Sequence, residues 1–277
     1  MGIVPYDSSR RSDLAALTVR VWGGEPDEGE LEWFHERNPV RPSSVLLGEE
    51  DGAVVASVAL SFVRMTIAGA DVEVGIAVRL ATDPAAQGRG WFTRLQQANE
   101  ERARELGVGL LLVVPNAASE PILAARLGWT RLPSIRLWAR PRLLPARQAA
   151  CTVERFVDTA PSGREGEIVR DDAWLNWRFA ACPRPYTLLE GDGVAVIGRR
   201  GKAGMLALSD GGLLRAATAA AAGPAVVAAP PPGERGRYAR AGYVPTNRRL
   251  RVLGKALDPG VNLPAAVHLQ LGDLDFV

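Results

Sequence analysis

Several residue types are scarce in this chain of 277 residues, and each scarcity argues against a class of protein. The two cysteines, Cys151 and Cys182, lie far apart without metal-ligand spacing, so we expect neither a disulfide framework nor a zinc site. The two histidines, His35 and His268, are too few for a metal centre unless carboxylates supply most ligands. No apolar run approaches the roughly 20 residues that span a bilayer, and the first residues lack the apolar core of a secretory signal. We therefore expect a cytoplasmic protein with no metal and no membrane partner.

An excess of charge is missing as well. The 33 basic residues are balanced by 31 acidic ones, which leaves a net charge of +2 and no general field to attract a polyanion. We therefore expect no nucleic-acid partner. With 47% apolar and 23% charged residues the composition is that of an ordinary globular protein, and the length suits two domains of average size.

The clearest pattern is a strand followed by a loop with two glycines and then a helix. From Val72 to Ala81, apolar residues alternate over ten positions with the period of a strand. The loop at 84–90 reads PAAQGRG. The polar segment from Trp91 to Leu106 carries the apolar stripe of a helix, which Gly107 ends.

A glycine loop that opens a helix suits a pyrophosphate. Gly88 and Gly90 allow the backbone to approach phosphate oxygens, the helix N-terminus adds roughly half a positive charge, and Arg89 offers a further contact. A dinucleotide-binding motif does not fit, because G-x-G-x-x-G is missing, and a Walker loop does not fit, because no Gly-Lys-Ser/Thr follows. The simpler alternative is a plain turn at the start of a helix.

The remaining patterns predict alternating helices and strands in both halves. In the first half they predict helices at 8–22, 28–37 and 116–127, and strands at 44–48, 53–65, 108–114 and 129–138. Pro141 and Pro145 mark a linker. In the second half they predict helices at 171–179, 213–222 and 235–241, and strands at 186–190, 194–200, 205–209, 225–229 and 247–257. Aligning Gly128 with Gly242 also pairs Trp129 with Tyr243, which indicates a degenerate repeat.

The strand, loop and helix resemble motif A of the GNAT superfamily of acyl-CoA N-acyltransferases. The pattern Q/R-x-x-G-x-G/A stands here as Gln87-Gly88-Arg89-Gly90-Trp91-Phe92, with Phe92 in place of the last glycine. The family's next segment, an apolar strand, an Asn, a helix and a Gly-aromatic pair, is similar to 108–114, Asn116 and Gly128-Trp129. The order of elements agrees over about half of the chain.

The resemblance implies a fold and an activity. The fold is α/β, with a GNAT-like mixed, mostly antiparallel sheet flanked by helices, in two tandem GNAT-like domains at 1–142 and 143–277. The activity is transfer of acetyl from acetyl-CoA, or of another acyl group, to a primary amine of a small molecule by direct attack. The second half completes the acceptor site or braces the first. A non-catalytic acyl-CoA-binding regulatory module is the alternative.

The resemblance also assigns roles to residues. Backbone groups of Leu80 and Thr82 pair with the pantetheine arm, which lies like an added strand. Backbone N–H groups from Gln87 to Trp91 hold the pyrophosphate, and Asn116 bonds the pantetheine or the amine side. The cofactor-binding residues expected in this way are Leu80, Ala81, Thr82, Gln87, Gly88, Arg89, Gly90, Trp91, Phe92, Asn116 and Ser119.

The candidate catalytic base is Glu73, the only acid on the key strand, because attack needs a neutral amine and a group that accepts its proton. A solvated or salt-bridged residue is the alternative for Glu73. The family's common acid, a tyrosine four residues before the Gly-aromatic pair, is replaced by Ala124, whereas Tyr238 stands at the equivalent place in the second half. A thiolate leaving group with a pKa near 8.5 needs only modest help. For His35 we expect a surface or packing role.

Overall fold

The computed structural model describes residues 2–141, 152–209 and 211–274, which form two compact units. The first unit comprises Met1–Met65, Asp71–Leu132 and Val252–Ala265, and the second comprises Thr66–Ala70, Pro133–Arg251 and Ala266–Val277. The division therefore alternates along the sequence. The predicted boundary between residues 142 and 143, Pro145 of the linker and Cys151 lie outside the described residues.

The sheet of the first unit has the strand order β1-β2-β3-β4-β5, followed by the end of β12. Its strands are β1 (Gly2–Pro5), β2 (Ser44–Glu50), β3 (Ala53–Ile67), β4 (Ala70–Thr82), β5 (Leu110–Val113) and β12 (Val244–Ala256). The pairs β1–β2, β2–β3 and β5–β12 are antiparallel, whereas β4 and β5 run parallel. The pair β4–β5 is thus a parallel pair within an otherwise antiparallel part of the sheet.

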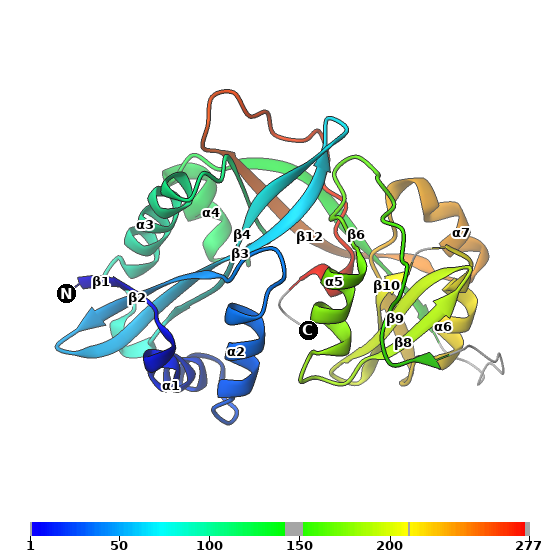
Figure 1. Cartoon of the computed structure of the whole chain (residues 1–277), viewed down its shortest axis with the longest axis horizontal. Helices are drawn as coiled ribbons and strands as arrows, with labels where there is room; N and C mark the ends of the chain where they lie inside the picture. The colour runs from blue at the N-terminus through cyan, green and yellow to red at the C-terminus, as the bar shows by residue number, and fades with distance from the viewer. Residues whose placement is uncertain (1, 142–151, 210, 275–277) are drawn as a thin grey trace. The chain divides into compact units, whose positions relative to one another are not determined.

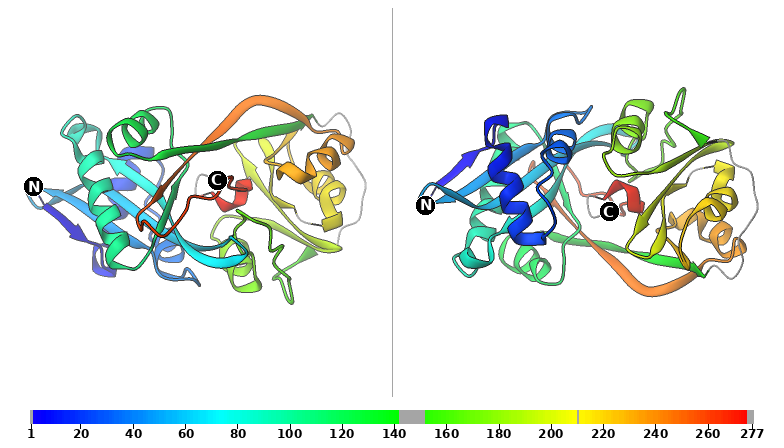
Figure 2. Two further views of the ribbon diagram at one scale, coloured as in Figure 1. Left: turned by 90° about the horizontal axis from the view of Figure 1, so that it is seen from above. Right: turned by 90° about the horizontal axis from the view of Figure 1, so that it is seen from below.

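Helices cover both faces of this sheet because its strands alternate apolar residues to either side. On β2, Val45 and Leu47 pack in one cluster with residues of α1 (Arg11–Trp22) and α2 (Glu28–Glu36). Leu46, between them, packs in another with residues of α3 (Trp91–Glu105). Figure 2 shows α3 over the sheet in the view from above and α1 under it in the view from below.

The second unit repeats this plan around the strand order β6-β11-β10-β9-β8-β7 (Figure 1). Its strands are β6 (Thr130–Pro141), β7 (Thr152–Val153), β8 (Thr187–Gly191), β9 (Gly193–Arg200), β10 (Ala203–Ser209) and β11 (Ala225–Ala228). Its helices are α5 (Asp172–Leu175), α6 (Leu214–Ala220) and α7 (Arg235–Arg240). Leu214 and Ala217 of α6 and Tyr238 of α7 pack on Ile197 and Leu206 of the sheet.

Each half of the sequence gives its last strand to the other unit. Residues Trp138–Pro141 of β6 pair antiparallel with β11, and residues Leu253–Ala256 of β12 pair antiparallel with β5. Lys255 stabilises the pairing of β12 with β5, because its Nζ donates to Glu100 of α3 at 2.5 Å and to the carbonyl of Leu127 at 2.6 Å. The indole of Trp129 donates to the same buried carboxylate at 2.7 Å. The first unit therefore includes residues Val252–Ala265, which come late in the sequence.

The predicted fold class, a mixed and mostly antiparallel sheet flanked by helices, is confirmed. Two helix predictions were wrong in extent, and short edge strands were missed. The helix expected at 116–127 is α4 (Ser119–Pro121) followed by a π-helical turn at Ile122–Arg126, and the one expected at 171–179 is α5 followed by a π-helical turn at Asn176–Ala180. The spacing of apolar residues along the sequence does not distinguish these π-helical turns from a regular α-helix. The edge strand β1 was missed, because four residues are too few for a pattern.

Candidate functional site

The glycine loop is held in its shape from both ends. At its start, the carboxylate of Asp83 accepts a hydrogen bond from the backbone N–H of Ala85 at 2.9 Å and pairs with Arg20 at 2.5 Å. At its end, Gly88 and Gly90 have φ angles of 77° and 79°, a left-handed conformation that side chains other than glycine rarely adopt. A Cβ at either position would meet no atom within 4 Å, so this side of the loop is open.

Gly90 is also the N-cap of α3, and no side chain caps this end of the helix. The first N–H groups of a helix have no partner inside the helix, and the aligned peptide dipoles place roughly half a positive charge there. The helix has 15 residues, so this dipole is fully developed. The open loop and the uncapped helix end together form a site that suits an anion.

Trp91 anchors the helix start beneath the loop. Its side chain is 1% exposed, and its indole nitrogen donates to Glu50 of β2 at 2.8 Å. Its ring lies so close to Gly48 that a Cβ there would come within 2.6 Å of the ring. Arg89 pairs with the second oxygen of Glu50 at 2.5 Å. Sequence reasoning missed Gly48 and Glu50, because they lie forty residues before the loop.

The guanidinium of Arg89 is thus already paired in this structure, although its exposed fraction of 51% leaves it accessible from solvent. Arg94, one turn into α3, lies with its guanidinium 4.0 Å from the centre of the Trp91 ring and donates to the carbonyl of Arg89 at 3.2 Å. Two arginines therefore flank the loop.

Strands β4 and β5 pair over only three residues each, from Gly75 opposite Leu111 to Ala77 opposite Val113. Two residues later Arg79 adopts a φ of 48°, which an arginine takes only where the surroundings hold it. It is held because its guanidinium pairs with Glu30 at 2.6 Å and lies 4.6 Å from the centre of the Phe34 ring. This left-handed residue interrupts the regular strand conformation of β4 just after its pairing with β5 ends.

Leu80, Ala81 and Thr82 follow Arg79, past the last pair of β4 with β5. Leu80 packs with residues of α3, whereas Ala81 packs on the opposite face with α1. The three residues lead directly into the glycine loop. Of the predicted cofactor-binding residues, nine thus lie on the continuous stretch 80–92, at the end of β4, in the loop and at the start of α3.

Asn116 and Ser119 lie where β5 gives way to α4. The side-chain oxygen of Asn116 accepts from the N–H groups of Ala118 at 3.0 Å and Ser119 at 2.9 Å, and the Ser119 hydroxyl lies 3.1 Å from the same oxygen. These bonds fix the turn at 116–119 that leads into α4 and account locally for both residue types.

Glu73 lies apart from the loop. Its carboxylate pairs with Arg41 at 3.1 Å, and Arg41 also donates to the carbonyl of Leu106 at 3.3 Å. Leu106 follows the C-terminal end of α3, whereas the loop precedes its N-terminal end, and a 15-residue helix is about 22 Å long. The structure therefore does not bring Glu73 and the glycine loop together.

His35, for which sequence reasoning expected a surface or packing role, is 1% exposed. Within the described residues neither ring nitrogen has a hydrogen-bond partner. A cavity of about 10 Å³, lined by His35, Ser57 and Arg79 among others, adjoins it, and that volume is enough for one water molecule. Burial, helped by the charge of Arg79, holds the pKa of the imidazole well below its usual value. The ring is therefore neutral at pH 7.

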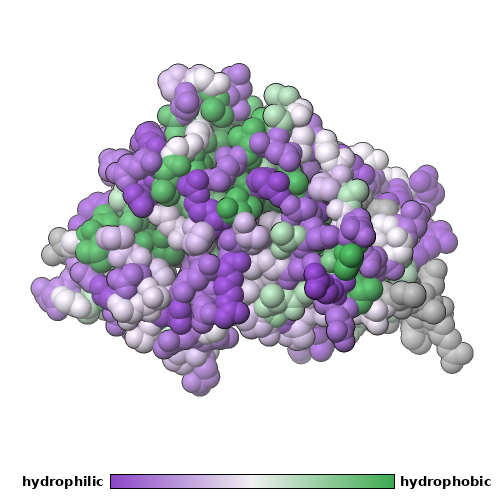
Figure 3. All heavy atoms as spheres, viewed as in Figure 1, coloured by the Kyte–Doolittle hydropathy of each residue, from purple (hydrophilic) through white to green (hydrophobic). Residues whose placement is uncertain are grey.

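Other functional classes find no support in the described ranges. There, no group of three or more His, Cys, Asp and Glu side chains could hold a metal ion. Among the described helices, none combines the length and the apolar character needed to cross a bilayer. Hydrophilic residues gather over α2 on the face seen in Figure 3, and α2 begins with the acidic residues Glu28 and Glu30.

Comparison with known proteins identifies the first half and the overall fold. A family model described as an acetyltransferase (GNAT) domain matches residues 3–132. The structure of a putative acetyltransferase from Pyrococcus horikoshii is similar with a TM-score of 0.69 and 12% identity, over 100% of this chain and 95% of that one. A tandem GNAT protein from the clavulanic acid biosynthesis pathway is similar with a TM-score of 0.58 and 13% identity, over 94% of this chain and 99% of that one.

A probable N-acyltransferase from Enterococcus faecalis V583 is similar with a TM-score of 0.65 and 10% identity, over 92% of this chain and 72% of that one. No curated protein matches the sequence. At such identities the solved structures show a common fold, and the family assignment comes from residues 3–132.

Proposed function

Residues 3–132 of this chain belong to the GNAT superfamily of acyltransferases, and from this premise we propose that the first unit binds an acyl-CoA and transfers its acyl group. The proposed donor is acetyl-CoA, and the proposed acceptor is a primary amine of a small molecule. The reaction is direct attack of the amine on the thioester.

The observation that carries the proposal is the open, uncapped start of α3. Left-handed glycines at 88 and 90 leave the loop backbone accessible beside the positive end of the helix dipole, and the N–H groups from Gln87 to Trp91 are the proposed donors to the phosphates. These features fit a pyrophosphate. Arg89 and Arg94 add positive charge beside it.

The stretch before the loop supports the same proposal. A pantetheine arm carries two amides, and the backbone of Leu80 and Thr82, beyond the last pair between β4 and β5, offers strand-like partners to such amides. Ala81 lies between them and Phe92 follows the loop. Asn116 is still proposed to bond the pantetheine or the amine side, and with Ser119 it also holds the turn at the end of β5.

The chemistry that these residues must support is limited. The amine nitrogen forms a bond to the acyl carbon, the carbon–sulfur bond breaks, and the sulfur leaves as a thiolate. The amine loses one proton to a base and the thiolate takes up one proton, so the products are an amide and free CoA thiol. Because thiols of this kind have a pKa near 8.5, the leaving group needs little help at neutral pH. The sequence has no cysteine before position 151, so the first half offers no thiol for an acyl-enzyme intermediate. Glu73 stays the candidate base, and its ion pair with Arg41 supports the structural alternative.

The test is isothermal titration with acetyl-CoA. Gly90→Glu puts a side chain and a negative charge where the phosphates are proposed to lie, and we expect it to abolish binding. Gly107→Glu is the matched control, because Gly107 has a φ of 76° and open space at its Cβ but lies at the other end of α3. Equal binding by the two variants, or no binding by the wild type, would contradict the proposal.

One observation favours a second candidate, a non-catalytic acyl-CoA-binding module. Ala124 occupies the position of the family's tyrosine and packs against the apolar cluster behind β5, so it offers no proton. The two candidates differ in turnover. Release of free CoA thiol with a panel of primary amines supports the enzyme, and tight binding without release from any amine supports the module.

A further inference from the structure

The second unit contains an opened strand pair like the one that the proposed function uses in the first. Strands β10 and β11 run parallel but pair only at Gly204–Val226 and Met205–Val227. The register between β10 and β9 then shifts between Leu206 and Leu208, the mark of a bulge. Ser209 ends the strand and is 1% exposed, so its backbone groups lie in the interior.

The side chain of Gln270 occupies the hydrogen-bonding groups at the end of β10. Its Oε1 accepts from the N–H of Ser209 at 2.9 Å, and its Nε2 lies 3.5 Å from the carbonyl oxygen of the same residue. One carboxamide thus serves both backbone groups of one residue, as a neighbouring strand does. Gln270 is 3% exposed and comes from a segment sixty-one positions further along the chain.

The residues around Gln270 fit closely against the bulge. At Gly272 a Cβ would come within 3.0 Å of the carbonyl oxygen of Ala207 and within 2.7 Å of the Phe179 ring, so only glycine fits there. Leu269, Leu271 and Leu274 are each at most 3% exposed. The segment thus contacts β10 at the shifted register itself.

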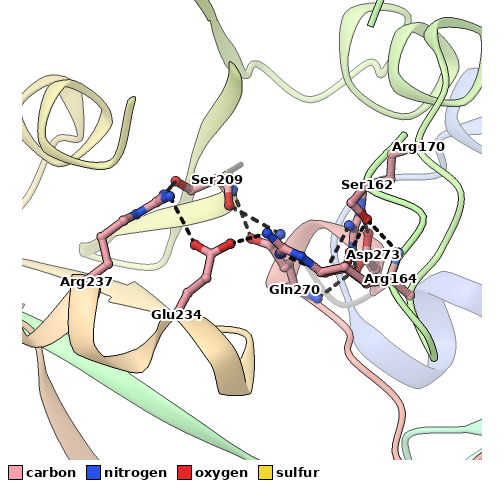
Figure 4. A network of polar contacts seen from close by, with 9 residues as sticks. Ser162, Arg164, Arg170, Ser209, Glu234, Arg237, Gln270 and Asp273 are labelled. Carbon is pink, nitrogen blue, oxygen red and sulfur yellow. Dashed lines mark hydrogen bonds and ion pairs between the residues drawn. The ribbon is translucent and has the colours of Figure 1, made fainter. Parts of the chain in front are cut away.

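Charged side chains clamp the same segment, as Figure 4 shows. Arg170 donates through two nitrogens to Asp273, at 3.0 Å and 2.6 Å, and both side chains are buried. Asp273 also accepts from the backbone N–H of Gln270 at 2.7 Å, which fixes the turn that presents the carboxamide. Arg178 donates to the carbonyl of Leu274 at 2.8 Å. Buried, bidentate pairs of this kind give orientation as well as attraction.

We propose that the opened strand pair of the second unit is a peptide-binding slot, and that the chain's own segment 266–274 is its ligand. The slot selects a carboxamide side chain for the Ser209 backbone and, three residues later, a carboxylate for Arg170. Because the ligand is tethered, its effective concentration is high and free ligands do not compete. The second unit therefore takes no acyl-CoA. That the whole chain takes one acyl-CoA rests on the proposed function, whereas the peptide slot does not.

The test uses the full chain and a fluorescently labelled peptide of residues 266–274, AVHLQLGDL. In the double variant Gln270→Ala/Asp273→Asn the tethered segment loses its two polar side-chain anchors, while no residue of the slot is substituted and the bond from Arg178 to Leu274 stays. We expect the peptide to bind this variant in a fluorescence-anisotropy titration and not to bind the wild type. A control peptide with alanine at the glutamine position should bind at least tenfold more weakly.

Failure of the peptide to bind the folded double variant, or equal binding to the wild type, would overturn the proposal. If the double variant does not fold, Gln270→Ala alone is used, because it leaves the Arg170–Asp273 pair intact. The peptide is then added at millimolar concentration, so that it competes with the tethered segment for the slot. Titration of the wild type with acetyl-CoA gives a second measurement. One molecule per chain is expected, and two molecules, or one that persists in Gly90→Glu, would contradict a filled second slot. No binding at all would reject the proposed function of the first unit and leave the peptide result to decide for the second.

Discussion

The two units open a parallel strand pair in the same way and differ in the segment that leaves the first strand of that pair. In the first unit β4 leads through residues 83–90 and two left-handed glycines into the 15 residues of α3. In the second, the helix that follows β10 is α6, with seven residues. In both units the parallel pair ends before its first strand does, at Ala77 and at Met205. Beyond that point the first unit has the uncapped start of α3, whereas in the second the side chain of Gln270 bonds the backbone of Ser209.

The polar residues of the two units are also distributed in complementary ways. The first unit has the loop but carries Ala124 where the second carries Tyr238. That tyrosine is fully buried, and burial raises the pKa of its phenol. A group of this kind, on a unit without a phosphate site, serves the core.

The largest effect is expected from breaking the clamp of the second unit. Asp273→Ala leaves the buried guanidinium of Arg170 without its bidentate partner, and breaking such a pair costs about 3 to 5 kcal/mol of the free energy of unfolding. Urea unfolding followed by tryptophan fluorescence measures this. The control is Glu105→Ala, because Glu105 and its partner Arg102 are exposed and such pairs are worth at most about 1 kcal/mol. A loss no larger than that of the control would show that the second unit does not depend on the segment.

The second largest effect is expected in the pH dependence of the free energy of unfolding, to which His35 of the first unit and His268 of the second should contribute differently. Burial lowers the pKa of His35 in the folded state, so the unfolded chain binds its proton first as the pH falls. The free energy of unfolding should therefore fall below pH 6.5, by up to about 1.4 kcal/mol per pH unit. His35→Leu should remove most of this slope. His268 is half-buried and its pKa is lowered less, so His268→Leu should change the slope less, and the reverse order would contradict this interpretation.

The features that could be predicted from the sequence were local. The alternation from Val72, the glycines at 88 and 90 and the helix after them fall where expected, because period and backbone conformation are properties of neighbouring residues. The contacts that these elements make with distant parts of the chain could not be predicted. Nothing in the residues of β12 says that it pairs with β5, and nothing near Trp91 points to Glu50. Gln270 also lies in a segment with no pattern, since its role depends on Ser209.

A smaller effect tests whether the loop of the first unit needs its left-handed glycines. Gly90→Ala introduces no clash, because nothing lies within 4 Å of the new Cβ, but it strains the φ of 79°. We expect a loss of about 1 kcal/mol in the free energy of unfolding. Gly233→Ala, at an open position without a left-handed φ, should be neutral. Equal losses in both variants would mean that backbone conformation is not the reason for glycine in the loop.

The smallest effect is expected from giving the first unit the tyrosine of the second. Ala124→Tyr supplies a phenol to the leaving thiolate, but a group with a pKa near 8.5 leaves without much help at pH 7, so kcat should rise less than about tenfold. The new side chain must also fit into the apolar cluster that holds Ala124, and thermal unfolding will show whether it does. Tyr238→Phe is the matched control and should leave kcat unchanged. A rise of a hundredfold or more, with a new ionisation in the pH profile, would mean that protonation of the thiolate limits the reaction and that Ala124 is the residue that keeps the first unit slow.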